Sequence, residues 1–178
     1  MENSNNIFVF DVDGTLLKPS GNRIDDKAIE ALKKVSQFGK VVLASARPLK
    51  GITNLYSDSE IKIDNIIALN GALISTHENF PKSFPIKNEV SNYFLSNSHT
   101  FQNLWFFTAD IWFSNNLTSS EYSVEKNAVS FNAVSLENYN QEPVLKITLV
   151  TEGKFENLQS ISNDIEITTS NENYIEIQ

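Results

Sequence analysis

Runs of apolar residues alternate with polar segments along the first half of the chain. The runs are rich in β-prone residues, which predicts a strand buried on both faces at 7–10, a second buried strand at 40–44 and a third strand at 64–69. The segments between them carry apolar side chains at helical spacing, which predicts helices over 23–38 and 49–59. Strand, helix, strand, helix, strand is typical of an α/β fold with a parallel sheet and right-handed crossovers.

The pattern changes from about residue 75, where Asn, Ser, Phe and Glu become frequent. This part predicts a second, α+β unit, with helices near 88–98 and 154–163 and strands near 104–108, 111–113, 144–150, 166–168 and 174–177. An aromatic cluster around Trp105 and Trp112 is expected in its core, and the stretch 121–125 is expected to be solvated. The sequence therefore predicts two domains, residues 1–74 and 75–178.

Two carboxylates follow the first strand, one residue apart. Asp11 and Asp13 repel each other and are poorly solvated at the end of a buried strand, so they are expected to need a cation. Oxygen ligands of this kind suit Mg²⁺. In open α/β sheets ligands bind outside the carboxyl ends of the strands, which is where both residues fall. A surface turn after a core strand is the other interpretation of this pattern.

The segment Asp11-Val12-Asp13-Gly14-Thr15-Leu16 resembles the first motif of the haloacid dehalogenase (HAD) superfamily, Asp-x-Asp-Gly-Thr-Leu. The resemblance implies that Asp11 attacks a phosphorus atom and that Asp13 acts as general acid and base. It also implies Mg²⁺ at Asp11 and Asp13, and phosphoryl oxygens held by backbone N–H groups near Gly14 and Thr15.

A second group, Ser45-Ala46-Arg47, follows the second predicted strand and precedes a helix. It resembles the second HAD motif, in which Ser or Thr holds the phosphoryl group, although Ala46 replaces the Gly that is usual in members with large caps. Arg47 is expected to contact phosphate or substrate. The alternatives are that Ser45 caps the helix and that Arg47 pairs with a surface acid.

A third group, Asn70-Gly71-Ala72, ends the third predicted strand and resembles the same position in Cof-type HAD phosphatases. There the Asn faces the active cleft, but Asn-Gly also forms turns in any context. The resemblance extends over nearly the whole chain. It implies a HAD-like Rossmannoid core, truncated on its C-terminal side, with an inserted α+β cap.

The resemblance breaks after residue 178. Phosphatases of this type continue with a lysine-bearing helix and a strand that ends in a Gly-Asp motif, and no Gly-Asp pair occurs in these 178 residues. Without the remaining core strands, the apolar strand at 7–10 is expected to form an open edge. We therefore expect the 178 residues alone to leave that strand unburied and to be a poor phosphatase. A further stretch of the polypeptide or a second copy is expected to cover the edge.

Composition narrows the possible partners. A net charge of −8 argues against nucleic-acid binding, and no apolar run approaches the length of a membrane span. The chain has no cysteine and a polar, acidic start, which favours a cytoplasmic protein.

The function that the resemblance implies is Mg²⁺-dependent hydrolysis of a small phosphate monoester, such as a sugar phosphate, through an aspartyl-phosphate. Two alternatives stay open. One is a phosphotransferase of the phosphomannomutase type, which would need a bisphosphate activator. The other is a catalytically impaired module that binds phosphorylated metabolites or a protein partner.

Overall fold

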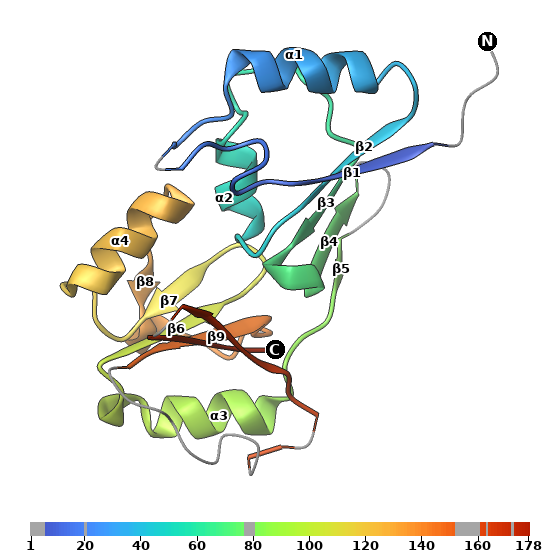
Figure 1. Ribbon diagram of the computed structural model, residues 1–178. Helices are drawn as coiled ribbons and strands as arrows, with labels where there is room; N and C mark the ends of the chain where they lie inside the picture. Colours follow the sequence, from blue (N-terminus) through green and yellow to red (C-terminus); the bar gives the residue numbers. More distant parts are fainter. Residues whose placement is uncertain (1–5, 20, 77–80, 152–160, 163, 172) are drawn as a thin grey trace. The chain divides into compact units, whose positions relative to one another are not determined.

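The computed structural model describes all residues except 1–5, 20, 77–80, 152–160, 163 and 172. The chain divides into two compact units (Figure 1). The first comprises Met1–Ser83 and Ala128–Ser130, and the second comprises Phe84–Asn127 and Phe131–Gln178. The functional domain boundary after residue 74 stays a prediction.

The first unit is an α/β structure. Its sheet has the strand order β1-β2-β3-β4-β5, with β1 at Ile7–Asp11, β2 at Lys40–Ala44, β3 at Asn65–Ala68, β4 at Leu73–Thr76 and β5 at Lys82–Ser83. Its helices are α1 at Asp26–Val35, α2 at Leu49–Asn54 and the short 3₁₀ helix η1 at Leu69–Gly71.

The strands β1, β2 and β3 pair in parallel, as predicted. Asp11 lies opposite Ala44, and Ala44 lies opposite Ile67, so the carboxyl ends of the three strands are level. After β3 the chain reverses, and β4 and β5 extend the sheet in antiparallel fashion. The hydrophobic pattern gives no separate signal for β4 and β5, because both are short and lie beside polar residues.

The edge strand β1 differs from the prediction of burial on both faces. Ile7 and Val9, which share one face, are 63% and 57% exposed, whereas Phe8 and Phe10 on the other face are partly buried. Within the described residues β1 pairs with β2 alone. The expectation that these 178 residues leave the first strand unburied is confirmed.

The second unit is an α+β structure with a six-stranded sheet in the order β10-β11-β9-β6-β7-β8. Its strands are β6 at Asn103–Phe107, β7 at Trp112–Ser114, β8 at Val134–Ser135, β9 at Lys146–Val150, β10 at Ile167–Asn171 and β11 at Tyr174–Ile177. Its helices are α3 at Asn88–Ser96 and most of α4 at Ser120–Val129, with 3₁₀ helices η2 at Ser98–Thr100 and η3 at Leu136–Asn138. All neighbouring strands are antiparallel except β7 and β8.

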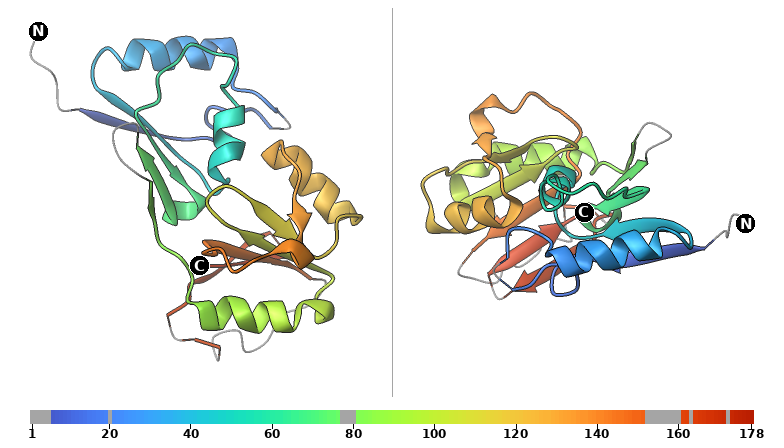
Figure 2. Two further views of the ribbon diagram at one scale, coloured as in Figure 1. Left: turned by 180° about the vertical axis from the view of Figure 1, so that it is seen from behind. Right: turned by 90° about the horizontal axis from the view of Figure 1, so that it is seen from above.

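The core of the second unit lies between α3 and one face of the sheet, along which α3 runs (Figure 2). Val90 and Phe94 of α3 are fully buried there against Leu104 and Phe106 of β6. The predicted aromatic cluster is buried as well. Trp112, for example, is 0% exposed and stacks on Phe107 with ring centroids 5.6 Å apart.

Two sequence expectations for the second unit have different outcomes. The stretch 121–125, expected to be solvated, lies on α4, where most side chains are exposed but Tyr122 is buried. The helix predicted over 154–163 falls largely outside the described residues. No helix in the described part of the chain is long and apolar enough to cross a membrane.

Candidate phosphoryl-transfer site

The loop after β1 is closed by its own backbone. The Val12 carbonyl accepts hydrogen bonds at 3.3, 3.0 and 2.8 Å from the N–H groups of Thr15, Leu16 and Leu17. The N–H of Gly14 donates to the Leu17 carbonyl at 2.9 Å, and Gly14 has a φ of 79°, a conformation that glycine adopts at little cost. The N–H groups of Gly14 and Thr15 thus already donate within the loop, and their binding of phosphoryl oxygens stays a prediction.

The two candidate carboxylates lie at the start of this loop. Asp11 is the last residue of β1, Asp13 follows two positions later, and both are exposed. Two carboxylates at the carboxyl end of a parallel sheet can be reached by a cation, and an anionic substrate can then bind to that cation. The structure therefore presents both acids to solvent.

Asp13 is held by a fork of hydrogen bonds from Arg47, 34 positions away. The Arg47 Nη2 and Nε atoms donate to Asp13 Oδ1 and Oδ2 at 2.7 and 2.8 Å. The Arg47 side chain is 14% exposed and that of Asp13 is 52% exposed. A bidentate guanidinium–carboxylate pair is geometrically specific as well as attractive. Of the two partners considered for Arg47, this structure shows the acid, and that acid is itself a candidate catalytic group.

Ser45 follows β2 and is mostly buried. Its Oγ accepts a hydrogen bond from the Arg47 N–H at 3.1 Å, which forms a local turn typical of serine. The helix α2 begins only at Leu49, and its N-cap position is Pro48, so Ser45 does not cap it. The serine instead shapes the loop that carries Arg47, while Ala46 between them is exposed.

The loop after β3 is tied to the loop after β2. The Asn70 N–H donates to the Ser45 carbonyl at 3.3 Å, and the Leu69 N–H donates to the Arg47 carbonyl at 3.0 Å. Leu69, Asn70 and Gly71 have φ values of 51°, 53° and 101°, all in the left-handed region. Such a conformation is uncommon for leucine and costs free energy. The predicted turn is confirmed, and the Asn70 side chain is exposed at its tip.

These placements bring the three sequence groups to one end of the sheet. Because Asp11, Ala44 and Ile67 are level across the parallel strands, Asp11, Ser45 and Asn70 all follow the same edge. The prediction of this arrangement is confirmed. The chemical roles of the residues stay predictions.

The donor set fits Mg²⁺ in the form in which proteins usually bind it. Mg²⁺ is held by one or two carboxylates and completes its octahedron with water and substrate phosphate. Asp11 supplies one such carboxylate, and the described residues contain no cluster of three His, Cys, Asp or Glu side chains. Asp11 is the accessible ligand, because the Asp13 carboxylate is paired with Arg47.

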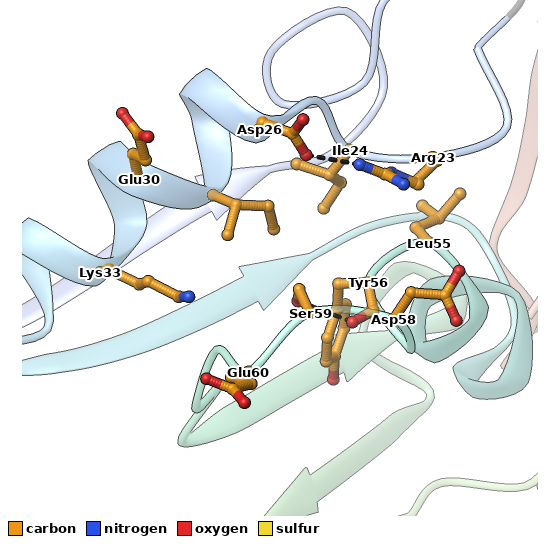
Figure 3. A pocket seen from close by; sticks show the side chains of 11 residues that line it. Arg23, Ile24, Asp26, Glu30, Lys33, Leu55, Tyr56, Asp58, Ser59 and Glu60 are labelled. Atoms are coloured by element: carbon orange, nitrogen blue, oxygen red, sulfur yellow. Dashed lines mark hydrogen bonds and ion pairs between the residues drawn. The ribbon is translucent and has the colours of Figure 1, made fainter.

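A separate cavity of about 410 Å³ lies between α1 and the segment after α2 (Figure 3). Charged side chains around it include Arg23, which points toward Asp26, as well as Lys33 and Glu60. Burial raises the pKa of Tyr56 in this cavity. None of the predicted site residues lines it. The cavity is therefore distinct from the acid pair at the strand ends.

Solved structures share this fold at low sequence identity. A protein from Thermotoga maritima matches with a TM-score of 0.79 and 23% identity, over 96% of this chain and 68% of the other. A haloacid dehalogenase-like hydrolase from B. subtilis matches with a TM-score of 0.77 and 18% identity, over 97% of this chain and 72% of the other. A sugar phosphatase of HAD subclass IIB matches with a TM-score of 0.75 and 22% identity, over 97% of this chain and 69% of the other. The likeness to these three establishes the fold.

No curated protein sequence matches the chain. A family model of haloacid dehalogenase-like hydrolases matches residues 8–178, from the first strand to the last residue. That range includes the acid pair, Ser45, Arg47 and Asn70, all at one end of the parallel strands. The chain belongs to the family of haloacid dehalogenase-like hydrolases.

Proposed function

We propose that this chain carries the nucleophile and the general acid of a Mg²⁺-dependent phosphatase that hydrolyses a small phosphate monoester such as a sugar phosphate. The observation that carries the proposal is the acid pair at the end of β1, with Asp13 bound by Arg47 from the adjacent strand end. Family membership supports a hydrolase, and the sugar phosphatase among the similar structures supports the fold in which such a reaction occurs. A cytoplasmic location is part of the same proposal.

Asp11 is the nucleophile in this proposal. Its carboxylate attacks the phosphorus atom in line with the leaving alkoxide, the bond from phosphorus to that oxygen breaks, and an aspartyl-phosphate forms. Bound Mg²⁺ would neutralise charge on the carboxylate and on the phosphoryl oxygens. Asp11 suits this role because it is exposed, follows a parallel strand and makes no ion pair that the structure records.

Asp13 is the general acid and base. In its acid role it gives a proton to the leaving oxygen, and it later takes a proton from the water that attacks the aspartyl-phosphate. In the structure both carboxylate oxygens of Asp13 accept hydrogen bonds from Arg47, so neither faces a leaving oxygen freely. We therefore propose that Arg47 moves from Asp13 to the phosphoryl oxygens when substrate binds, which leaves Asp13 able to carry the proton.

The experiment is phosphate release from a panel of small phosphate esters, with Mg²⁺ and with a chelator, in the protein that contains this chain. The proposal expects turnover that needs Mg²⁺ and no added cofactor. Isomerisation of a sugar phosphate without phosphate release, seen only with a sugar bisphosphate activator, would instead identify a mutase. Tight binding of phosphorylated metabolites with no turnover would identify an impaired binding module.

A further inference from the structure

A short segment from far along the chain forms part of the first unit. Residues 128–130 belong to that unit, although its main part ends at Ser83. Ala128 and Val129 are the last residues of α4, and Ser130 follows with a φ of 62°, in the left-handed region where many helices end. The last carbonyl groups of a helix have no partner within it. The 128–130 segment therefore presents backbone acceptors to the residues around it.

Two side chains of the first unit donate to these acceptors. Nη1 of Arg47 donates to the carbonyl of Ala128, 81 positions away. Nδ2 of Asn54, the last residue of α2, donates to the Ser130 carbonyl at 3.2 Å. The loop after β2 and the helix that follows it thus bind the segment at both of its ends.

The middle of the segment approaches α2 at Gly51. A β-carbon added to Gly51 would lie 3.2 Å from the carbonyl oxygen of Val129 and 3.5 Å from its Cα. The first distance is closer than ordinary van der Waals contact, and the atom that it meets belongs to the backbone. Val129 itself is buried. A residue larger than glycine at position 51 would therefore displace the segment from its present place.

The Ala128 carbonyl gives Arg47 an acceptor in addition to Asp13. Nε and Nη2 donate to Asp13 and Nη1 donates to Ala128, so all three guanidinium nitrogens are engaged. A guanidinium is planar, and acceptors on two of its edges fix the direction of the plane. The exposed Asp13 side chain can rotate, whereas a backbone carbonyl moves only with its segment. The orientation of Arg47 therefore depends on how firmly the 128–130 segment is held.

We propose that Gly51 and Asn54 are positioning residues for Arg47. Asn54 fixes the segment at its end, Gly51 allows its close approach, and the Ala128 carbonyl keeps the guanidinium in place while it exchanges Asp13 for a phosphoryl group. Neither Gly51 nor Asn54 belongs to the sequence groups that predict the site. The use of Arg47 in substrate binding rests on the proposed function, but its orientation can be measured without turnover.

Nuclear magnetic resonance of the ¹⁵N-labelled 178-residue chain measures that orientation. The chain contains two arginines, so the spectrum holds one Nε–H signal each for Arg23 and Arg47, and Arg23→Lys assigns them. Arg23 is exposed and pairs with Asp26, which makes it an internal reference. Asn54→Ala should raise the rate at which the Arg47 Nε–H exchanges with water roughly three- to tenfold, the effect of losing one hydrogen bond. The Arg23 rate should stay unchanged.

The variant Gly51→Ala separates positioning from helix stability. Alanine favours a helix over glycine, so this change should strengthen α2 while it displaces the Val129 carbonyl, and the Arg47 rate should rise. Thr53→Ala is the matched control, because it also raises helix propensity, whereas the Thr53 hydroxyl donates to the Lys50 carbonyl within α2. It should leave the Arg47 rate unchanged. Circular dichroism verifies that each variant is folded.

Steady-state kinetics in the protein that contains this chain test the consequence for substrate binding. Asn54→Ala should raise KM for a phosphate ester roughly threefold or more, because Arg47 is then less well oriented. Combined with Arg47→Ala it should have no further effect, since both changes remove one and the same interaction. A purely structural role of Asn54 would instead add its effect to that of Arg47→Ala.

The exchange rates decide the proposal. An Arg47 rate that stays at the wild-type value in both Asn54→Ala and Gly51→Ala would overturn it, and so would an equal increase in Thr53→Ala. An increase in one of the two variants alone would remove the other residue from the proposal. Raised rates in a protein that hydrolyses no phosphate ester would support the positioning of Arg47 and contradict the phosphatase. Turnover with unchanged rates would do the reverse.

Discussion

Asp13 and Arg47 are connected by two hydrogen bonds that join the loops after β1 and β2. The pair holds the Arg47 guanidinium in a fixed orientation at the candidate site. In the proposed reaction Arg47 must leave Asp13 and bind the phosphoryl oxygens. The sequence predicts both residues separately, from the motifs that contain them. Their pairing could not be predicted, because nothing in a sequence reports which of several acids a guanidinium 34 positions away will reach.

The first prediction concerns Arg47. Replacing it with alanine should raise KM for a phosphate ester roughly tenfold or more, because hydrogen bonds to charged groups contribute about 1.5–3 kcal/mol. Arg47→Lys should restore only part of this, since an ammonium cannot form the fork. Steady-state kinetics measure both, with Lys27→Ala on the exposed side of α1 as control. A KM that is unchanged in Arg47→Ala would remove Arg47 from substrate binding.

Among the elements, β1, β2, β3, β6 and β9 could be predicted because each contains a short run of apolar, β-prone residues. The helix α3 could be predicted as well. The helix α4 could not, because its sequence Ser-Glu-Tyr-Ser-Val-Glu-Lys-Asn-Ala-Val has a weak apolar stripe, and Val124 within it is 62% exposed. The helix α1 is better specified. Asp25 precedes it as N-cap, accepts a hydrogen bond from the Ala28 N–H at 2.9 Å and forms an ion pair with Lys18.

The second prediction is a pH dependence from this cap. The hydrogen bond from Lys18, with that from the Ala28 N–H, holds the pKa of Asp25 below its usual value. Because this pKa is lower in the folded state than in the unfolded state, the charged carboxylate stabilises the fold fully at any pH above the usual aspartate pKa. This stabilisation is lost as the pH falls through the pKa of Asp25 in the folded state. The free energy of unfolding of the wild type should therefore exceed that of Asp25→Asn at neutral pH. The difference should shrink below about pH 4.

Denaturant titrations across this range measure the difference. Asp58→Asn serves as control, because Asp58 is an exposed aspartate that caps no helix. A difference that stays constant with pH would show that the charge of Asp25 contributes nothing.

The third prediction concerns α3. Phe94 is 0% exposed in the core of the second unit, whereas its neighbour Tyr93 is 42% exposed. Phe94→Ala should lower the free energy of unfolding by about 3–5 kcal/mol through lost burial and the cavity left behind. Tyr93→Ala should cost much less. If urea titrations showed the same loss of unfolding free energy in the two variants, Phe94 would not lie in the core of the second unit.

At the level of the whole molecule, β1 is an edge strand with an exposed apolar face. Ile7 and Val9 expose apolar surface on a strand that pairs with β2 alone in the described structure. Open edges of this kind recruit other strands. We propose that a second copy of the chain or a further segment of the polypeptide covers this edge. The sequence predicts that this edge needs a cover, because the strand at 7–10 is apolar on both faces.

The fourth prediction follows from this edge. The 178-residue chain should self-associate at micromolar concentration, and Ile7→Thr with Val9→Thr should shift it toward the 20.0 kDa monomer. Light scattering after size exclusion measures the mass, with Val124→Thr on the exposed part of α4 as control. A monomeric wild type would show that β1 tolerates solvent, and an associated double variant would place the interface elsewhere.

Asp11 is proposed as the nucleophile of a phosphatase. The decisive measurement is Mg²⁺-dependent phosphate release by the protein that contains this chain, with the Asp11→Asn variant compared with the wild type. Asp11→Asn should abolish turnover without loss of fold. Asp13→Asn should lower turnover roughly 10²- to 10⁴-fold, as expected for a general acid and base. Turnover of a phosphate ester that survives Asp11→Asn unchanged would contradict the account.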